Sequence, residues 1–190
     1  MTQRMALWSA LVALALVSAQ FGAIRFAPSA TLVRVALPAT IAAVPLALWP
    51  LRDRLGTWIV FVGLAANLAV ILANGGLMPI ERHTIAAAAG EERAARYRPG
   101  AWISGSKDVL VGPGSGHAVP LGDSIVVHIG EGGFVASPGD IIVWAGLVVL
   151  AGEASLAWQR RASRGHRAAS ESEKAVAGGE RAEGSAATSS

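Results

Sequence analysis

Two asparagines and two Gly-Asp pairs are the side chains in this sequence best placed to make specific polar contacts. Asn67 and Asn74 lie seven residues apart in a long apolar run, so they project from about the same face of a helix. Asparagine in such a run commonly joins helices through its amide, so we expect both residues to hydrogen-bond between helices. Gly122-Asp123 and Gly139-Asp140 come later, and Asp140 stands where another apolar run begins, so its carboxylate is expected to cap free N–H groups. The two aspartates should tie the segment between the apolar runs to the helix ends.

Other residue patterns that could support catalysis or metal binding lack the context that such sites need. His83, His117 and His128 could gather with the aspartates around a metal, but their spacing matches no ligand motif. Ser104 to Lys107 fits the S-x-x-K pattern of serine acyl-enzymes, yet the sequence lacks the helix start and the supporting motifs that this chemistry requires. We therefore expect no catalytic residue, no metal and no cofactor.

The composition places the chain in a membrane. Of its 190 residues, 53% are hydrophobic and only 15% are charged, which is too few polar groups to cover a soluble domain of this size. The net charge of +3 comes from loops and the tail, so it does not indicate a nucleic-acid partner. The absence of cysteine excludes disulfides, thiolate metal sites and cysteine nucleophiles.

Four apolar segments are long enough to cross a bilayer as helices, which takes roughly 20 residues. A helix satisfies its backbone polar groups internally, and lipid offers them no other partner. The predicted spans are residues 5–24, 31–51, 56–74 and 140–158. Tryptophans lie near the predicted span ends, where an amphipathic indole is favoured: Trp8, Trp49, Trp58, Trp144 and Trp158.

The first two spans each allow a second interpretation. Val17-Ser18-Ala19 follows a basic start and an apolar stretch, as in a cleaved secretory signal, although the apolar run continues to Ile24. In the second span, Arg34, Pro38 and Pro45 could form a hinge or a cation site on a transport path. They could equally be features that membrane helices tolerate, with Arg34 reaching the headgroups.

Basic residues set the expected orientation, because they concentrate on the cytoplasmic side of membrane proteins. Those that gather on one side of the predicted spans are Arg4, Arg52, Arg54, Arg160, Arg161, Arg164 and Arg167. The other side has only Arg25 close by, with Arg82 and Arg93 farther along a longer loop. The sequence therefore predicts both termini in the cytoplasm and residues 75–139 outside.

The third span is predicted to end abruptly. Asn74-Gly75-Gly76 should close the helix, because glycine accepts the left-handed conformation found at helix ends. Met78-Pro79 should then continue in an extended shape, since proline disfavours helix at the preceding residue.

Residues 75–139 are predicted to form a small α+β cap on the outer face. A short helix is expected from Thr84 to about Tyr97, with Gly90 as a weak point, and β-branched runs at residues 108–111 and 124–129 should form strands. Residues 159–190 lack an apolar period and should be a disordered cytoplasmic tail.

The chain carries a series of motifs in a distinctive order: Asn74-Gly75-Gly76-Leu77-Met78-Pro79-Ile80, a strand with Lys107, Leu121-Gly122-Asp123, and Ser137-Pro138-Gly139-Asp140-Ile141-Ile142 before the last apolar helix. In this order they resemble an uncharacterised family of bacterial multi-pass membrane proteins, catalogued as a domain of unknown function. The resemblance covers about residues 30–158, and family members often read Ser-Ile-Gly-Asp where this chain has Ser-Pro-Gly-Asp. It implies the topology above and linked roles for Asn74, Asp123 and Asp140, but no activity, substrate or cofactor.

The expected fold is therefore an all-α transmembrane protein of about four helices, with a small α+β extracytoplasmic cap between the third and fourth. The expected role is a non-enzymatic accessory or scaffold subunit of a bacterial inner membrane, which meets a membrane protein partner or a second copy of itself. One alternative is a small transporter or channel-like component with a polar path along the Asn67 and Asn74 face. Another is a membrane enzyme that uses the cap carboxylates.

Overall fold

The computed structural model describes residues 3–129, 132–160 and 163, and it divides into two units, Met1–Leu150 and Ala151–Ser190. Four helices in the described residues are long and apolar enough to cross a membrane: Leu7–Arg25, Ala30–Leu51, Leu55–Ala73 and Pro138–Arg160. These bounds agree with the four predicted spans to within a few residues. Almost all of the predicted disordered tail lies outside the described residues.

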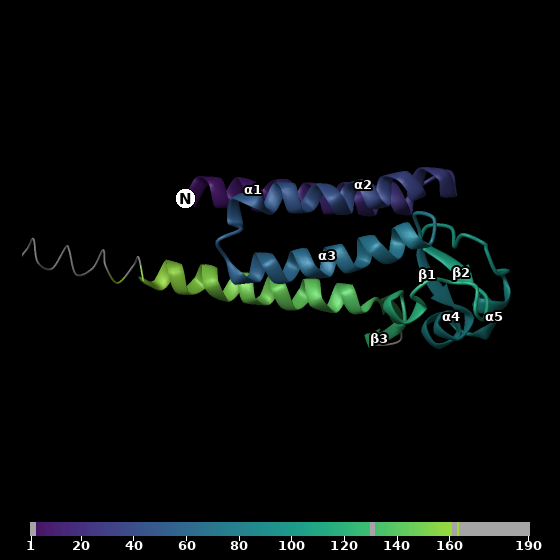
Figure 1. Ribbon diagram of the computed structural model, residues 1–190. Coiled ribbons are helices and arrows are strands. Elements are labelled where there is room, and N and C mark those ends of the chain that lie inside the picture. The colour runs from purple at the N-terminus through teal and green to yellow at the C-terminus, as the bar shows by residue number, and fades with distance from the viewer. Residues whose placement is uncertain (1–2, 130–131, 161–162, 164–190) are drawn as a thin grey trace, which may run out of the picture. The chain divides into compact units, whose positions relative to one another are not determined.

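Three of these helices precede the region that carries the polar motifs. They are α1 (Gln3–Arg25), α2 (Ala30–Leu48), which leads into the single turn η1 (Trp49–Leu51), and α3 (Leu55–Ala73). Helices α1 and α2 lie side by side (Figure 1). Helix α2 is continuous through Pro38 and Pro45, so neither proline ends it.

Large apolar side chains point away from the protein along much of the helical surface. Examples on α1 are Leu7, Trp8 and Phe21, which are 60%, 68% and 72% exposed. A soluble domain rarely exposes so many large apolar side chains together, whereas a lipid-facing surface requires them. The helices are therefore built to lie in a membrane.

Helix α3 packs against the first part of the final helix (Pro138–Arg160) through glycines that let the two backbones approach. A Cβ atom added at Gly63 would lie 2.7 Å from the carbonyl oxygen of Gly139, and one added at Gly146 would lie 2.7 Å from the backbone nitrogen of Val60. Small residues at such contacts are typical of helix pairs in membranes, where close packing and interhelical hydrogen bonds drive association. This contact fixes where the polar residues near Gly139 lie.

Residues 74–137, called the connecting region below, contain short helices and strands. In chain order they are β1 (Met78–Glu81), α4 (Arg82–Ala89), α5 (Glu91–Ala95), β2 (Asp108–Val111), η2 (Val119–Leu121), β3 (Ile125–Ile129) and β4 (Gly132–Ala136). The helix predicted from Thr84 to Tyr97 is present as α4 and α5, and it breaks at Gly90, whose φ is 88°. The two predicted strand runs are β2 and β3. Neither β1 nor β4 was predicted as a strand. Both are short, β1 contains a proline and β4 begins with two glycines, and these residue types are uncommon in strands.

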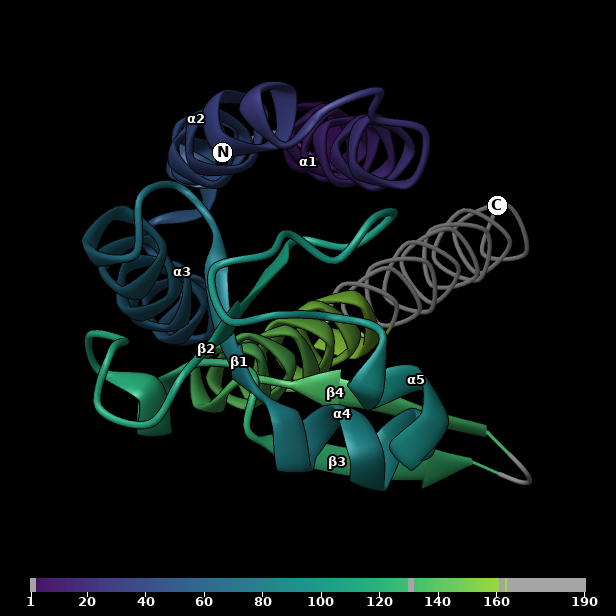
Figure 2. The ribbon, with the colours of Figure 1, turned by 90° about the vertical axis from the view of Figure 1, so that its right-hand side faces the viewer.

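Strand β1 lies at the centre of the connecting region. It pairs in parallel with β2, with Met78 opposite Asp108, and α4 and α5 form the crossover that a parallel pair requires. On its other side, Ile80 forms a parallel bridge with Asp123. Strands β3 and β4 form a separate antiparallel pair, against which α4 packs (Figure 2).

Candidate functional site

The final helix begins with a capping box. The backbone N–H of Asp140 donates to the Ser137 hydroxyl, and the backbone N–H of Ser137 donates to Asp140 Oδ2, each at 3.0 Å. Ser137 is thus the N-cap residue, and Pro138 occupies the first helical position, where its missing N–H costs nothing. The sequence prediction that Asp140 opens the helix is wrong by two residues, since Asp140 lies inside the first turn and bonds backwards to Ser137.

Asn67 of α3 is joined to this helix start. Its Nδ2 donates to Asp140 Oδ1 at 2.8 Å, and its Oδ1 accepts a hydrogen bond from the Ser137 hydroxyl at 2.8 Å. Asn67 and Ser137 are 5% and 0% exposed. The Asn67 amide therefore forms the interhelical hydrogen bond that the sequence predicted for it.

Lys107 connects this pair of helices to the connecting region. Its Nζ lies 3.0 Å from Asp123 Oδ1 and 3.2 Å from Asp140 Oδ2, and its side chain is 25% exposed. The lysine thus bridges a carboxylate of the connecting region and a carboxylate of the final helix. We call Lys107, Asp123, Asp140, Asn67 and Ser137 the lysine network.

A third carboxyl group, that of Asp108, lies beside the lysine network. The Ser106 hydroxyl donates to Asp108 Oδ2 and also accepts from the backbone N–H of Asp108. Asp108 Oδ1 is buried and has no hydrogen-bond partner among the described residues. The charge of Lys107 thus interacts with three carboxyl groups, those of Asp123, Asp140 and Asp108.

The electrostatics of the three groups in the connecting region follow from burial and from one another. Burial disfavours the charged form of Lys107, but the carboxylates of Asp123, Asp140 and Asp108 outweigh it and raise the pKa of the ammonium group. Burial, and then the negative charge of Asp108, raise the pKa of Asp123 to about 8, against the opposing effect of Lys107. Burial likewise raises the pKa of Asp108. Lys107 is thus charged at neutral pH, while the two aspartates compete for ionisation.

Strand β1 explains why these side chains meet. The backbone N–H of Met78 donates to the Lys107 carbonyl, and the backbone N–H of Asp123 donates to the Pro79 carbonyl, both at 3.0 Å. Gly122 permits this approach, because a Cβ atom there would lie 2.4 Å from the Pro79 carbonyl oxygen. Met78, Pro79 and Gly122, which the sequence singled out, therefore act as backbone supports of the lysine network.

The predicted residues Asn74, Gly75 and Gly76 do not join the lysine network. Gly75 and Gly76 have φ of 69° and 88°, and their N–H groups donate to the carbonyls of Leu72 and Ile71, which is the Schellman pattern of helix ends. Gly76 also packs on the Arg34 carbonyl, where a Cβ atom would come within 2.5 Å of the oxygen. Pro38 has no N–H, so the Arg34 carbonyl lacks the helical hydrogen bond that residue 38 would otherwise donate to it. Gly76 can therefore pack against this carbonyl.

Asn74 holds a loop of the connecting region rather than another helix. Its Nδ2 donates to the His117 carbonyl at 2.8 Å, and its Oδ1 accepts from the His117 backbone N–H at 3.0 Å. The prediction that Asn74 bonds between helices is therefore wrong. The asparagine lies at the end of α3, and the backbone that it meets there belongs to the loop before η2.

Asn74→Ala should release this loop. Losing the two hydrogen bonds to His117 should cost about 1 kcal/mol and raise the exchange rate of the His117 amide hydrogen about fivefold. Hydrogen exchange measured by mass spectrometry on the purified protein checks this. The Asp123 amide, which donates to Pro79, is the internal control and should keep its protection. Unchanged exchange at His117 would contradict the role of Asn74.

The three histidines singled out in the sequence lie apart. His83 is 3.5 Å from Glu81, His117 contacts Asn74 through its backbone, and His128 lies 3.3 Å from the Ala87 carbonyl oxygen. Within the described residues, no three histidine or acidic side chains are arranged to hold a metal ion. Ser104 lies in a turn rather than at a helix start, so the S-x-x-K pattern lacks its structural context.

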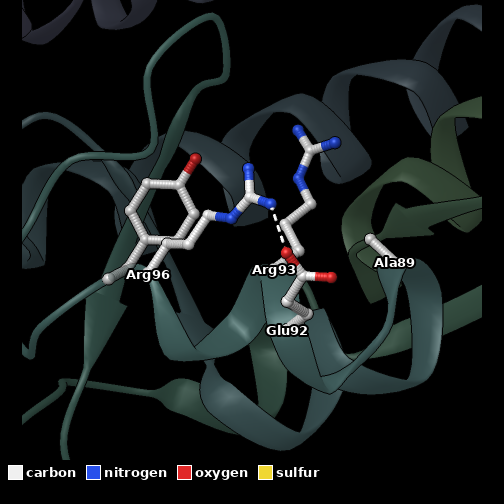
Figure 3. Close-up of a pocket in the computed structure, with 5 residues that line it drawn as sticks. Ala89, Glu92, Arg93 and Arg96 are labelled. Carbon is white, nitrogen blue, oxygen red and sulfur yellow. Dashed lines mark hydrogen bonds and ion pairs between the residues drawn. The ribbon is translucent and has the colours of Figure 1, made fainter.

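Three open pockets lie on the part of the connecting region that the structure describes. One, of about 460 Å³, is lined by Ala89, Glu92, Arg93, Arg96 and Tyr97, with Arg96 and Glu92 paired at 2.7 Å (Figure 3). Two others, of about 470 and 320 Å³, lie beside Asn74 and His117 and beside Arg82 and His83. Lys107, Asp108 and Asp123 line none of these three pockets.

Four residues of the site were not identified as site residues from the sequence: Ser106, Lys107, Asp108 and Ser137. For Lys107 a signal was present, because the sequence has lysine only at positions 107 and 174 while its other basic residues are arginines. For Ser137 the spacing Ser-x-x-Asp before an apolar run was the signal of a capping box. Ser106 and Asp108 carry no comparable signal, since their contact with each other depends on a local turn.

Residues 4–151 match a protein family described as a family of unknown function, DUF5317. This range contains the first three spans, the connecting region and the start of the final helix, so it includes the first span that the sequence resemblance left out. No curated protein and no solved structure matches the chain. Because the match covers most of its length, the chain belongs to the DUF5317 family.

Proposed function

We propose that this member of the DUF5317 family is a non-enzymatic scaffold subunit of a bacterial inner membrane. Its four helices anchor it, and the connecting region is a rigid extracytoplasmic surface that binds a membrane protein partner or a second copy of the chain. The lysine network is the observation that carries this proposal. It fastens β1 and β2 of the connecting region to α3 and the final helix through one partly buried lysine.

The use of the polar groups supports a structural role over a catalytic one. The Asn67 amide and the Ser137 hydroxyl are bonded within the network, and Lys107 is paired with two carboxylates. A catalytic group must reach its substrate, whereas Lys107 and Asp123 line none of the three open pockets. Rigid support of a surface needs only that the groups hold one another.

The placement of basic and aromatic residues supports the orientation. The turn between α2 and α3, at the end of the helices away from the connecting region, carries Arg52 and Arg54. Trp49 lies under Arg52 at 5.4 Å, and Trp58 Nε1 donates to the Arg52 carbonyl at 2.7 Å, as expected at a membrane–water interface. The positive-inside rule then puts both termini in the cytoplasm and the connecting region outside.

The transport alternative requires water along the Asn67 face of α3. That face is packed against the final helix at Gly63, Gly139 and Val143, and Val60, seven residues before Asn67, is 2% exposed. A polar path would have to open between backbones that are already in contact. The packed face therefore favours the scaffold.

Single cysteines test orientation and packing together, since the chain has no native cysteine. In intact cells, a membrane-impermeant thiol reagent should label Ser115→Cys, leave Ser163→Cys unlabelled and leave Val60→Cys unlabelled. All three should label after denaturation, which controls for expression. Labelling of Ser163→Cys alone would reverse the orientation, and labelling of Val60→Cys in intact cells would favour transport.

Partner binding is tested with a crosslinker placed on the surface of the connecting region. A photo-crosslinker attached at Ser115→Cys should give a discrete adduct in intact cells, and Lys107→Met should abolish it because the surface is no longer held. A surface that gives no adduct from Ser115, nor from Arg93→Cys as a second position, would contradict the scaffold proposal.

A further inference from the structure

We propose that the hairpin of β3 and β4 lies on the bilayer with one of its two faces in contact with lipid, at the level of the headgroups and the first acyl carbons. Two residues paired across an antiparallel hairpin point to the same side, and alternate residues along a strand share a face. Val127 is paired with Phe134, and Ile125 precedes Val127 by two residues. Ile125, Val127 and Phe134 therefore form one face, called the apolar face below.

The opposite face of the hairpin is covered by the connecting region itself. His128 and Val135 alternate with the residues of the apolar face, so they point to the other side. His128 Nε2 lies 3.3 Å from the Ala87 carbonyl oxygen of α4. Val135 packs against a buried apolar cluster that includes Ile85 of the same helix. Helix α4 thus accounts for this face and leaves the apolar face on the far side of the hairpin.

The apolar face is open where its large side chains lie. Ile125 and Phe134 are 36% and 39% exposed. The outward face of an antiparallel sheet in water normally carries polar side chains, whereas this one carries isoleucine, valine and phenylalanine. Apolar side chains gathered on a surface mark a contact with lipid or with another protein. The neighbouring helix decides between the two.

The apolar face continues directly into the lipid-facing side of the final helix. The Phe134 ring meets the Trp144 ring edge to face, with the ring centroids 5.9 Å apart. Trp144 and Val148 are 43% and 72% exposed, and each lies two residues from Gly146, which packs against α3, so both project from the opposite side of the helix. A protein partner on the apolar face would therefore have to displace the lipid from Trp144 as well. Lipid needs no such displacement.

The depth and direction of the hairpin fit the same occupant. Trp144 lies six residues after Pro138, where the span begins, so it is roughly 9 Å along the helix, within the zone where interfacial tryptophan is favoured. Figure 2 looks along the helices, and β3 and β4 lie across that direction. Strands that lie across the spans run parallel to the bilayer plane. One whole face of the hairpin can then meet the same layer of lipid, as amphipathic elements do at a membrane interface.

This inference rests on the proposed function in one respect, the placement of the four helices in a membrane. It holds for either orientation, because the hairpin precedes the final helix in whichever leaflet surrounds the start of that span. It also narrows the surface that remains for a partner to the sides of the connecting region that face away from the bilayer.

Spin labels on single cysteines test the contact, since the chain has no native cysteine. The full-length protein is reconstituted in vesicles of phosphatidylcholine and phosphatidylglycerol. Collisions of each label are then measured with oxygen, which concentrates in lipid, and with a water-soluble nickel complex. The ratio of oxygen to nickel collisions should be several-fold higher at Phe134→Cys and Ile125→Cys than at His128→Cys, on the opposite face of β3, and at Ser115→Cys.

Two results of this measurement would overturn the proposal. An equal ratio at all four positions would mean that the apolar face lies in water. Labels at Phe134→Cys and Ile125→Cys that meet neither reagent and lose their mobility would mean that a second copy of the chain covers the face. Ile125→Cys is the second position because it leaves the contact between Phe134 and Trp144 intact.

Photochemical crosslinking in intact cells tests for a protein on the same face. A photoreactive phenylalanine analogue in place of Phe134 keeps a ring beside Trp144, and it should give adducts with lipid but no discrete protein adduct. A discrete protein adduct from this position would overturn the lipid contact while supporting partner binding. Absence of adducts from Ser115→Cys and Arg93→Cys would instead refute the scaffold and leave the lipid contact standing.

Discussion

Lys107→Met is expected to lower the free energy of unfolding by about 3 kcal/mol, the lower end of the cost of removing one partner from a buried ion pair, because Lys107 and Asp140 are partly exposed. The methionine keeps most of the side-chain volume but leaves Asp123 and Asp140 facing each other without the ammonium group that now lies 3.0 and 3.2 Å from them. Equilibrium unfolding in mixed micelles measures the loss. Hydrogen exchange should localise it to β1, β2 and the start of the final helix.

Arg96→Met is the matched control for this substitution. Arg96 pairs with Glu92 at 2.7 Å, but both side chains are exposed, at 68% and 89%. Exposed pairs of this kind typically contribute less than about 1 kcal/mol, because water screens them. Equal losses for Lys107→Met and Arg96→Met would mean that the lysine network does not hold the connecting region.

A double substitution separates the ion pair from a simple packing effect. Without the ammonium group, Asp123 must either stay ionised with no partner or bind a proton. Adding Asp123→Asn to Lys107→Met removes that cost, so it should recover part of the lost stability. A packing defect at position 107 would not be repaired by an isosteric change at position 123. A double variant less stable than Lys107→Met alone would argue that Asp123 is held by other contacts.

Gly139→Ala is expected to have the second large effect. The added Cβ would lie 2.0 Å from Asn67 Oδ1 and 2.9 Å from the Gly63 carbonyl oxygen, so α3 and the final helix would have to separate. Overpacking of this kind costs about 1–3 kcal/mol, and loss of the Asn67–Asp140 hydrogen bond adds about 1 kcal/mol. Unfolding in mixed micelles again provides the measurement.

Gly22→Ala controls for the intrinsic preference of helices for alanine. Gly22 lies within α1, and a Cβ atom there would meet nothing within 4 Å. Alanine should therefore be neutral or stabilising by about 0.5–1 kcal/mol at that position. A Gly139→Ala protein as stable as Gly22→Ala would show that the two helix backbones do not approach as closely as described.

Local chemistry explains how much of the fold could be predicted. Each of the four spans is a continuous apolar segment, and a helix is the form that satisfies its backbone in lipid, so the spans needed no information from elsewhere in the chain. The helix end at Asn74-Gly75-Gly76 and the break at Gly90 are equally local, because both depend on the positive φ that glycine allows. The DUF5317 match confirms the resemblance to a family of unknown function.

The polar site was predictable only in part. Asp123, Asp140 and Asn67 stood out because carboxylates and amides are rare near apolar runs. Lys107 was set aside as part of a chance S-x-x-K pattern, because nothing local marks it as the partner of residues 16 and 33 positions away. Asn74 was assigned to the wrong partner, since its face of α3 is clear from the spacing but the loop that meets it is not.

The sequence by itself determined the four helices, the end of α3 and the mixed character of the connecting region, because apolar length and glycine conformation act over a few residues. Tertiary structure alone decided that β1 would lie between β2 and Asp123, and that one lysine would meet carboxylates from two separate segments. That outcome depends on the parallel register of β1 and β2 and on glycine contacts between α3 and the final helix. Both features depend on contacts between segments that are distant in the sequence. The energy that stabilises them comes from burial and strand pairing, which exist only once the chain has folded.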